Sequence, residues 1–121
     1  MKLVALTAIV AALAISTTAS GATPTLVGVD GPGFTITLTK GGKKVTKLTH
    51  GTYVFKISDK SGIHNFTLER EKPSKPHMEK VVTATGFAGS KTLVWTLKPG
   101  SWRAYCSVHE ALMHQDFKVT K

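Results

Sequence analysis

The stretch Tyr105-Cys106-Ser107-Val108-His109-Glu110-Ala111-Leu112-Met113-His114 decides how the rest of the chain is interpreted. It contains the only cysteine of the 121-residue sequence, a histidine three residues later and a methionine four residues after that. A lone cysteine is a small buried side chain, a reactive thiol or a metal ligand, and its neighbours decide which. Thiolate, imidazole and thioether groups in one short stretch favour a metal site.

The position of this stretch suggests how its donors meet. A Cys-x2-His spacing at the end of a strand lets the thiolate and the imidazole converge, while Met113 approaches from a third direction before the alternation Phe117, Val119 begins. A fourth ligand has to come from elsewhere in the chain. His64 is the best candidate, because it follows a glycine-containing turn and shares a strand face with Phe66 and Leu68.

Two imidazoles and a thiolate with a weak thioether form the ligand set of a copper site that transfers electrons. Zinc is served better by a fourth donor stronger than a thioether. The donors His64, Cys106, His109 and Met113 therefore predict one copper ion that alternates between Cu(I) and Cu(II).

The N-terminus is typical of an export signal. Lys2 is followed by an apolar run of 13 residues, 3–15, which is too short to span a bilayer. Small residues follow, and we expect a signal peptide over 1–22 and one domain over 23–121, in the periplasm or outside the cell. No basic stop-transfer cluster follows the run, so we expect no stable membrane anchor.

The remaining chain is basic. Removing residues 1–22 removes only Lys2, which leaves 15 basic and 7 acidic residues and a formal charge of +8. This charge favours acidic partners. We do not expect a nucleic-acid partner, because the lysines are scattered and no nucleic-acid-binding motif is present. About 100 residues suffice for one modest core, and we expect a monomer.

Alternating apolar residues with frequent turn signals predict an all-β fold, an antiparallel Greek-key sandwich or barrel of seven to eight strands. We expect an edge strand at 25–29 and a strand in which Phe34, Ile36 and Leu38 face the core. Further strands are expected at 45–48, 51–58, 63–68, 81–85, 92–97, 101–106 and 116–120. The charged, proline-bearing segment 69–80 is expected to be a long exposed loop.

At this point the chain resembles the cupredoxins, in particular small plastocyanin- and pseudoazurin-like blue copper proteins. The resemblance covers residues 33–119. Its most specific parts are Gly51-Thr52-Tyr53-Val54-Phe55, His64-Asn65-Phe66, and Gly100-x-Trp102-x-x-Tyr105-Cys106-x-x-His109 with Met113, Phe117 and Val119. It implies that His64, Cys106 and His109 are equatorial ligands of a type 1 copper, with Met113 axial and Asn65 bracing the cysteine loop.

The chain departs from that pattern in two places. Many relatives have proline where this chain has Val108, and glycine where it has Gln115. Neither change removes a ligand, but both affect the loop and the axial position. His114 is therefore an alternative axial donor, and it would lower the reduction potential.

Each of these residues has a simpler interpretation when taken alone. Cys106 would be a small buried side chain, Met113 core filler and His64 a satisfied polar group. We interpret His50 and the pair His77-Met78 as surface residues, which would also suit an additional, weaker copper-loading site. Asn65-Phe66-Thr67 matches a glycosylation sequon, but its place beside the metal argues against modification.

The function that these residues predict is a single-electron carrier that performs no catalysis itself. The electron would pass through His109, whose ring edge should reach the surface beside Ala111 and Leu112. An acidic redox protein, such as a cytochrome or an oxidoreductase, would dock briefly and in a salt-sensitive way.

Three alternatives belong to other classes. The first is a copper carrier or chaperone that moves the ion, and the second is a metal-free envelope sandwich with an incidental thiol. The third, a Cys–His hydrolase, is disfavoured because no third residue that would orient the histidine is recognisable.

Overall fold

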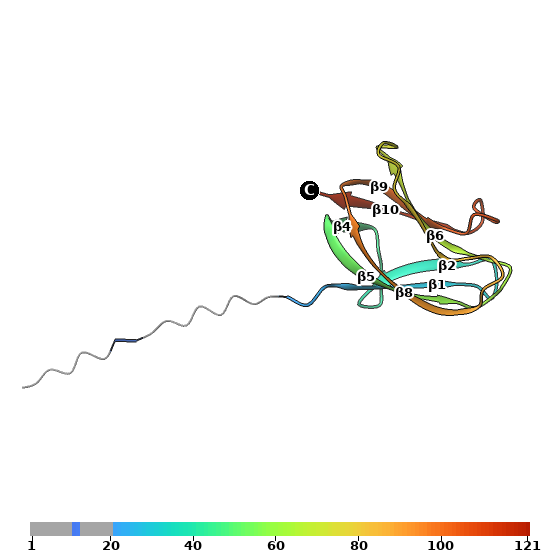
Figure 1. Cartoon of the computed structure of the whole chain (residues 1–121), viewed down its shortest axis with the longest axis horizontal. Coiled ribbons are helices and arrows are strands. Elements are labelled where there is room, and N and C mark those ends of the chain that lie inside the picture. The colour runs from blue at the N-terminus through green and yellow to red at the C-terminus, as the bar shows by residue number, and fades with distance from the viewer. Residues whose placement is uncertain (1–10, 13–20) are drawn as a thin grey trace, which may run out of the picture.

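The computed structural model describes residues 11–12 and 21–121, and this part of the chain forms a sandwich of two five-stranded sheets (Figure 1). The strands are β1 Thr25–Asp30, β2 Ile36–Lys40, β3 Lys43–Lys44, β4 Lys47–Thr49, β5 Gly51–Asp59, β6 Phe66–Lys72, β7 Glu79–Thr83, β8 Gly89–Leu97, β9 Gly100–Tyr105 and β10 His114–Thr120. Most of the predicted signal peptide, 1–22, lies outside the described residues. Within the described residues, no helix is long and apolar enough to cross a membrane.

The first sheet has the order β3-β2-β1-β5-β8, and the second has the order β4-β10-β9-β6-β7. Six of the pairings are antiparallel, while β1 with β5 and β4 with β10 are parallel. β5 pairs with β8 over nine residues, from Gly51↔Leu97 to Asp59↔Gly89. The long central strands of both sheets run along roughly the same axis. The loops that connect them therefore form one group at each end of the sandwich.

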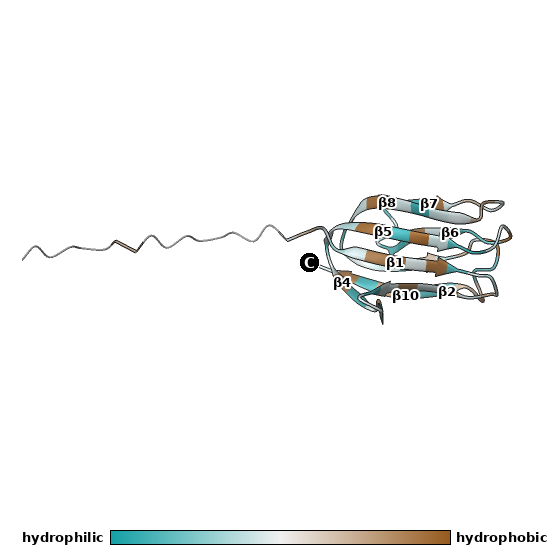
Figure 2. Ribbon diagram, turned by 90° about the horizontal axis from the view of Figure 1, so that it is seen from below, coloured by the Kyte–Doolittle hydropathy of each residue, from teal (hydrophilic) through white to brown (hydrophobic). Residues whose placement is uncertain are grey.

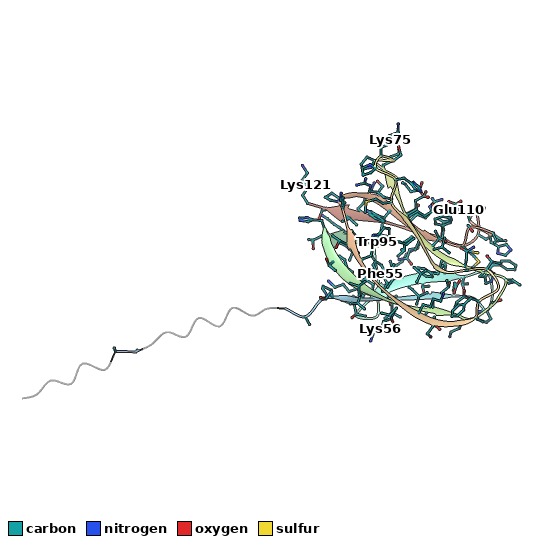
Figure 3. All side chains as sticks on the ribbon, viewed as in Figure 1. Phe55, Lys56, Lys75, Trp95, Glu110 and Lys121 are labelled. Carbon is teal, nitrogen blue, oxygen red and sulfur yellow. The ribbon has the colours of Figure 1, made fainter. Side chains whose placement is uncertain are left out.

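The core lies between the two sheets and follows from strand alternation. In β5 the side chains of Tyr53, Phe55 and Ile57 are buried, while Thr52 and Lys56 are exposed. Figure 2 shows the resulting alternation of apolar and polar residues along the strands, and Figure 3 shows Phe55 and Trp95 between the layers. Trp95 packs edge-on against Trp102, with 5.3 Å between ring centroids. Such aromatic packing stabilises the sandwich beyond simple area burial.

The predicted all-β sandwich is confirmed, with more strands than the seven to eight expected. Part of the difference is the short strand β3, Lys43–Lys44, which precedes the strand predicted at 45–48; that predicted strand corresponds to β4. The two parallel pairings make both sheets mixed. The sequence pattern could not show this, because alternation is the same in parallel and antiparallel edge pairs.

Two predictions at the start of the domain were wrong. The first strand, predicted at an edge, lies inside its sheet between β2 and β5. Gly28 in β1 makes this possible, because a Cβ there would lie only 2.4 Å from the Ile57 side chain and 2.6 Å from the Phe66 side chain. Phe34 was predicted to face the core, but it lies before β2 and is 53% exposed.

The segment 69–80 was predicted as an exposed loop and instead forms most of the β6–β7 hairpin. The prolines that argued against a strand, Pro73 and Pro76, lie in the turn between the strands. Arg70 is only 5% exposed, and its guanidinium donates to the Pro76 carbonyl at 2.9 Å and to the Pro99 carbonyl at 3.4 Å. A buried arginine thus stands where a sequence pattern would need an apolar residue, with two of its nitrogens bonded to backbone carbonyls and its Nε without a partner among the described residues.

The sandwich has two different ends. Loops 31–35, 60–65, 84–88 and 106–113 lie at one end, which we call the Cys106 end. The turns 41–42, 73–78 and 98–99, residue 50 and the C-terminus lie toward the opposite end. Figure 1 shows the β9–β10 loop and the C-terminus at opposite ends.

Candidate metal centre

The Cys106 end brings together three residues that the sequence analysis proposed as ligands. Cys106 directly follows β9, His109 lies in the β9–β10 loop, and His64 lies in the β5–β6 loop just before β6. Their ligand atoms all lie within 4.8 Å of one another. Because β6 pairs with β9, residues 42 positions apart in sequence meet where the two strands begin and end.

The three donor atoms have the spacing of a metal site. The Nδ1 atoms of His64 and His109 are 3.2 Å apart, and Cys106 Sγ lies 4.0 Å and 3.8 Å from them. With bonds of about 2.0 Å to nitrogen and 2.3 Å to sulfur, these separations correspond to angles at a shared ion of roughly 105°, 125° and 135°. The three donors are therefore close enough together to hold one metal ion in common.

The surroundings of these donors favour a ligand role over a purely structural one. His64 and Cys106 are both 0% exposed. The only polar side-chain contacts of the His64 ring are with the two other donors, and its Nε2 has no hydrogen-bond partner among the described residues. A buried imidazole without a conventional acceptor is costly. A metal bond would offset part of that cost, which is why the cluster fits a metal.

The two candidate axial residues have different positions. Met113 is 0% exposed and lies in the apolar core cluster that also includes Cys106. His114 begins β10 and is exposed, and its Nδ1 lies 2.8 Å from the Glu110 carbonyl oxygen. Strand alternation explains the difference, because neighbouring residues point to opposite faces. The buried thioether is thus the better placed of the two for a weak axial contact.

Backbone hydrogen bonds give the loop its shape. The His109 N–H donates to the Cys106 carbonyl at 3.2 Å, and the Met113 N–H donates to the His109 carbonyl at 2.9 Å. The loop closes where the Cys106 N–H donates to the Met113 carbonyl at 3.0 Å. These bonds place all three residues on one compact loop without needing a proline at position 108.

Asn65 joins this loop to two other segments. Its backbone N–H points at Cys106 Sγ at 3.4 Å, and its side-chain amide donates to Ser107 Oγ at 2.7 Å and Thr85 Oγ1 at 3.1 Å. Its side-chain oxygen Oδ1 accepts from the Ser107 N–H at 3.0 Å and from Thr67 Oγ1 at 2.9 Å. An N–H aimed at sulfur stabilises a thiolate, and the other bonds fix the orientation of the cysteine.

Phe34 is a residue at the site that sequence reasoning missed. Its ring meets those of His64 and His109 edge-on, with centroid distances of 5.6 Å and 4.9 Å. The glycines and proline of 31–33 mark the turn that carries it, but nothing in the sequence signals that this turn passes over the histidines. Ile63, Val108 and Leu112 are also exposed, at 56%, 55% and 70%. Apolar side chains therefore flank the partly exposed His109.

Gln115 has a role that the resemblance to the cupredoxins did not suggest. It is 5% exposed, and its amide nitrogen donates to the carbonyls of Leu38 at 2.8 Å and Val45 at 2.9 Å. Its side-chain oxygen accepts from the Leu38 N–H at 3.0 Å. The glutamine side chain thus bonds to the β2 backbone much as a neighbouring strand would. It connects β10 to the other sheet at a position two residues after Met113.

Arg103 on β9 organises the charged residues beside the loop. Its guanidinium makes a bidentate pair with Asp116, at 2.6 Å and 3.0 Å, and donates to Glu110 at 3.1 Å. These hydrogen bonds hold the pKa of Asp116 below its usual value. Because Glu110 lies in the β9–β10 loop, this network links the loop to both of its flanking strands.

A second group, Glu69, His77 and Glu79, also has ligand atoms within 4.8 Å of one another. Glu69 and Glu79 face each other on paired strands, and His77 Nε2 lies 3.4 Å from Glu79 Oε2. A hydrogen bond with the Glu79 carboxyl raises the pKa of Glu69 to about 7. A shared proton therefore suffices to explain this exposed cluster, and neither His77 nor the exposed His50 approaches the Cys106 donors closely enough to join them.

No protein-family model matches the chain, and no curated protein matches it in sequence. Solved structures do match its fold. Rusticyanin from Thiobacillus ferrooxidans is 20% identical with a TM-score of 0.55, over 84% of this chain and 79% of that one. Auracyanin from Roseiflexus castenholzii is 18% identical with a TM-score of 0.56, over 84% of this chain and 100% of that one.

Auracyanin A from Chloroflexus aurantiacus, described as a blue copper protein, is 14% identical with a TM-score of 0.54, over 79% of this chain and 98% of that one. These likenesses show that the chain has the cupredoxin fold. The identity of the donor atoms rests on the chain's own residues.

Proposed function

We propose that this chain is an exported type 1 copper protein that carries single electrons between redox partners. The observation that carries the proposal is the set of His64 Nδ1, Cys106 Sγ and His109 Nδ1, with Met113 buried in the same loop. Two imidazoles, a thiolate and a weak axial thioether are the donors of blue-copper electron-transfer sites. We propose Met113 as the axial ligand in preference to His114.

A bound copper ion would supply the one-electron chemistry, and the protein would supply a rigid donor set. The Asn65 N–H holds Cys106 Sγ, while the loop bonds between Cys106, His109 and Met113 restrict movement of the other donors. Because these contacts are made within the protein, they are independent of the oxidation state of an ion. Little rearrangement would therefore accompany electron transfer.

His109 is the proposed point of electron entry. It is the only one of the three clustered donors that is partly exposed among the described residues, and Ala111 and Leu112 beside it are exposed. Phe34, Ile63 and Val108 extend this apolar surface. A partner that docks here would exclude water from the short path to the ring, which favours brief, efficient contact.

The charge of a partner is a separate proposal. The loops of the Cys106 end contain only Lys60 and Glu110 as exposed charged residues. An acidic cytochrome or oxidoreductase would therefore be attracted by the net charge of the whole domain rather than by charges around His109. We propose that contact at His109 itself is mainly apolar.

The proposed location follows from the sequence alone. The charged start and apolar run of residues 1–22 support an export signal, and residues 23–121 would form the functional domain in the periplasm or outside the cell. Electron transfer through His109 requires no substrate pocket, so we propose no catalytic activity for the chain.

Repeated redox cycling in the presence of a strong Cu(I) chelator tests this function against that of a copper carrier. The copper-loaded protein is reduced with ascorbate and reoxidised with ferricyanide, while visible absorption and chelator absorption are recorded. We expect the blue absorption to disappear and return in each cycle with the copper retained, in wild type and in the matched control His114→Ala. Transfer of copper to the chelator at each reduction would instead identify an ion carrier.

A further inference from the structure

The lysines of the domain are distributed unevenly between its two ends. Six exposed lysines lie in or beside the turns and terminus opposite the Cys106 end, and we call them the basic end: Lys40, Lys43, Lys44, Lys47, Lys98 and Lys121. Lys118 pairs directly with Lys47, and Lys72 and Lys75 in the β6–β7 hairpin extend the same side. Figure 3 shows Lys121 and Glu110 at opposite ends of the sandwich.

The basic end carries positive charge that the protein itself does not neutralise. Within the part of the chain that the structure describes, every ion pair with a carboxylate uses Arg103 or His77, and none uses a lysine. Lys40 faces Lys43 across β2 and β3, and Lys47 faces Lys118 across β4 and β10. Like charges in directly opposite positions are destabilising. An anionic partner would relieve this repulsion.

The carboxylates lie elsewhere. Asp30 and Asp59 are buried at the Cys106 end of β1 and β5. Glu71, Glu110 and Asp116 surround Arg103, and Glu69 and Glu79 face each other on the β6–β7 hairpin. The domain is therefore strongly dipolar, with its most basic surface remote from the proposed copper site.

The course of the chain indicates which anionic partner this surface fits. β1 starts at Thr25 at the basic end, so the N-terminal segment of the sequence joins the domain there, and Figure 1 shows the described residues just before β1 at this end. That segment includes the apolar run 3–15, which export brings to the membrane. The lysines would then face the bilayer at the moment the domain folds beside it, and clustered lysines bind anionic lipid headgroups.

We propose that the basic end docks on an anionic phospholipid surface. In this orientation the strands run away from the bilayer and His109 faces the solution, where a redox partner reaches it. The attraction is electrostatic and reversible, because the surface consists of exposed lysines in or beside the turns. It is independent of copper binding.

Vesicle sedimentation tests the proposal. The protein is expressed from the full sequence and used in the form that the host exports. The vesicles contain phosphatidylcholine with or without phosphatidylglycerol, and the variant is Lys40→Gln/Lys43→Gln/Lys44→Gln. A matched control, Lys56→Gln/Lys60→Gln/Lys91→Gln, removes the same charge from the outer face of β5, from the β5–β6 loop and from β8. All three proteins have the same N-terminal segment, so any contribution from that segment cancels.

We expect wild type to bind the phosphatidylglycerol vesicles and to be released by salt. The basic-end variant should bind about 100-fold more weakly, and the control should lose much less affinity. An equal loss of vesicle affinity in both variants would show that binding depends only on net charge, and it would overturn the proposal. Binding to soluble polyglutamate but not to vesicles, or displacement by inorganic phosphate at constant ionic strength, would assign the surface to another anion and contradict the proposal.

Measurements on the same protein samples show whether a failure concerns the membrane proposal or the electron-carrier proposal. The visible spectrum and redox cycling of the copper-loaded basic-end variant should match those of wild type, because its three substitutions lie on the β2–β3 hairpin, away from the Cys106 end. Loss of vesicle binding with intact redox cycling concerns the basic end alone.

Discussion

At the scale of single residues, Asn65 links three segments of the Cys106 end. Its side chain and backbone make five hydrogen bonds, to Thr67, Thr85, Cys106 and Ser107. The residue is 4% exposed, so water does not replace partners that are lost. Its contribution to stability can therefore be measured without a metal.

We predict that Asn65→Ala lowers the free energy of unfolding of the metal-free protein by about 3 kcal/mol, since several buried polar groups lose their partners. Guanidinium chloride denaturation measures this change. Thr85→Ala, which removes one of the five bonds, should cost about 1 kcal/mol. Equal stabilities of Asn65→Ala and wild type would contradict the bracing role.

Asp30 makes the stability of the domain depend on pH. It is 0% exposed and pairs in register with the buried Asp59, and burial together with the Asp59 charge raises the pKa of Asp30 to about 7. The folded state therefore binds this proton more tightly than the unfolded state. The stability that the Asp30 proton contributes is fully present below about pH 4, and it is lost as the pH rises through about 7.

We predict that Asp30→Asn removes most of this pH dependence, which is on the order of 4 kcal/mol for a buried group with such a pKa shift. Urea denaturation of the metal-free protein between about pH 4 and pH 8 measures it. Glu69, whose pKa is also raised to about 7, should leave a smaller slope of the same sign. An unchanged slope in the variant would show that Asp30 is not the titrating group.

The proposed ligands were predictable from the sequence, but their surroundings were not. Cys106, His109 and Met113 are close in the chain, and His64 begins an apolar alternation, so spacing alone suggested the set. Phe34 could not be found in this way, because its contact with the histidines depends on how loop 31–35 crosses the Cys106 end. Local patterns do not encode such contacts between distant loops.

At the scale of elements, the connection between β10 and β2 depends on one side chain. Gln115 makes three hydrogen bonds to the backbone of Leu38 and Val45. β3 pairs with β2 only at Thr39 and Lys40, so Gln115 satisfies the Leu38 N–H, while the Leu38 carbonyl accepts from both Gln115 and the Val45 N–H. The start of β10 is thereby held against the other sheet.

We predict that Gln115→Ala lowers the free energy of unfolding by about 2 kcal/mol, because the Leu38 N–H and the Val45 carbonyl lose their partner and the Leu38 carbonyl keeps only the Val45 N–H. Gln115→Glu should cost more, because it places a carboxylate oxygen against the carbonyls of Leu38 and Val45. Thermal denaturation of both variants beside wild type measures the effect. If Gln115→Glu were as stable as wild type, the observed amide contacts would not matter for stability.

Strand alternation predicted the sandwich but could not predict its topology. The β5 pattern was clear because each second residue is buried. The β6–β7 hairpin was hidden because its inward position at 70 is an arginine, whose guanidinium donates to one carbonyl of the hairpin's own turn and to one of the distant β8–β9 turn. The interior position of β1 depends on the close approach of Gly28 to Ile57 and Phe66, which a pattern of residue types does not reveal.

At the scale of the whole molecule, the two ends have different properties. The Cys106 end has an apolar surface around His109, and the opposite end has unpaired lysines. Electron exchange and electrostatic docking would therefore use separate surfaces. A change at one end should leave the other unaffected.

We predict that Leu112→Glu slows electron self-exchange of the copper-loaded protein at least tenfold, because two docked copies would place like charges beside both His109 rings. Nuclear magnetic resonance line broadening of mixed oxidation states measures the rate. Val94→Glu is the matched control, since Val94 is 61% exposed on β8 and lies away from the site. Equal slowing by both variants would contradict exchange through the His109 surface.

The visible absorption spectrum after addition of Cu(II) tests the central claim most directly, namely that His64, Cys106 and His109 would together hold one copper ion. Wild type and His114→Ala should both show an intense blue band from charge transfer between the thiolate and copper, and Cys106→Ser should lack it. A wild-type protein that stays colourless with a freely titratable thiol, or a blue band that survives in Cys106→Ser, would contradict the claim.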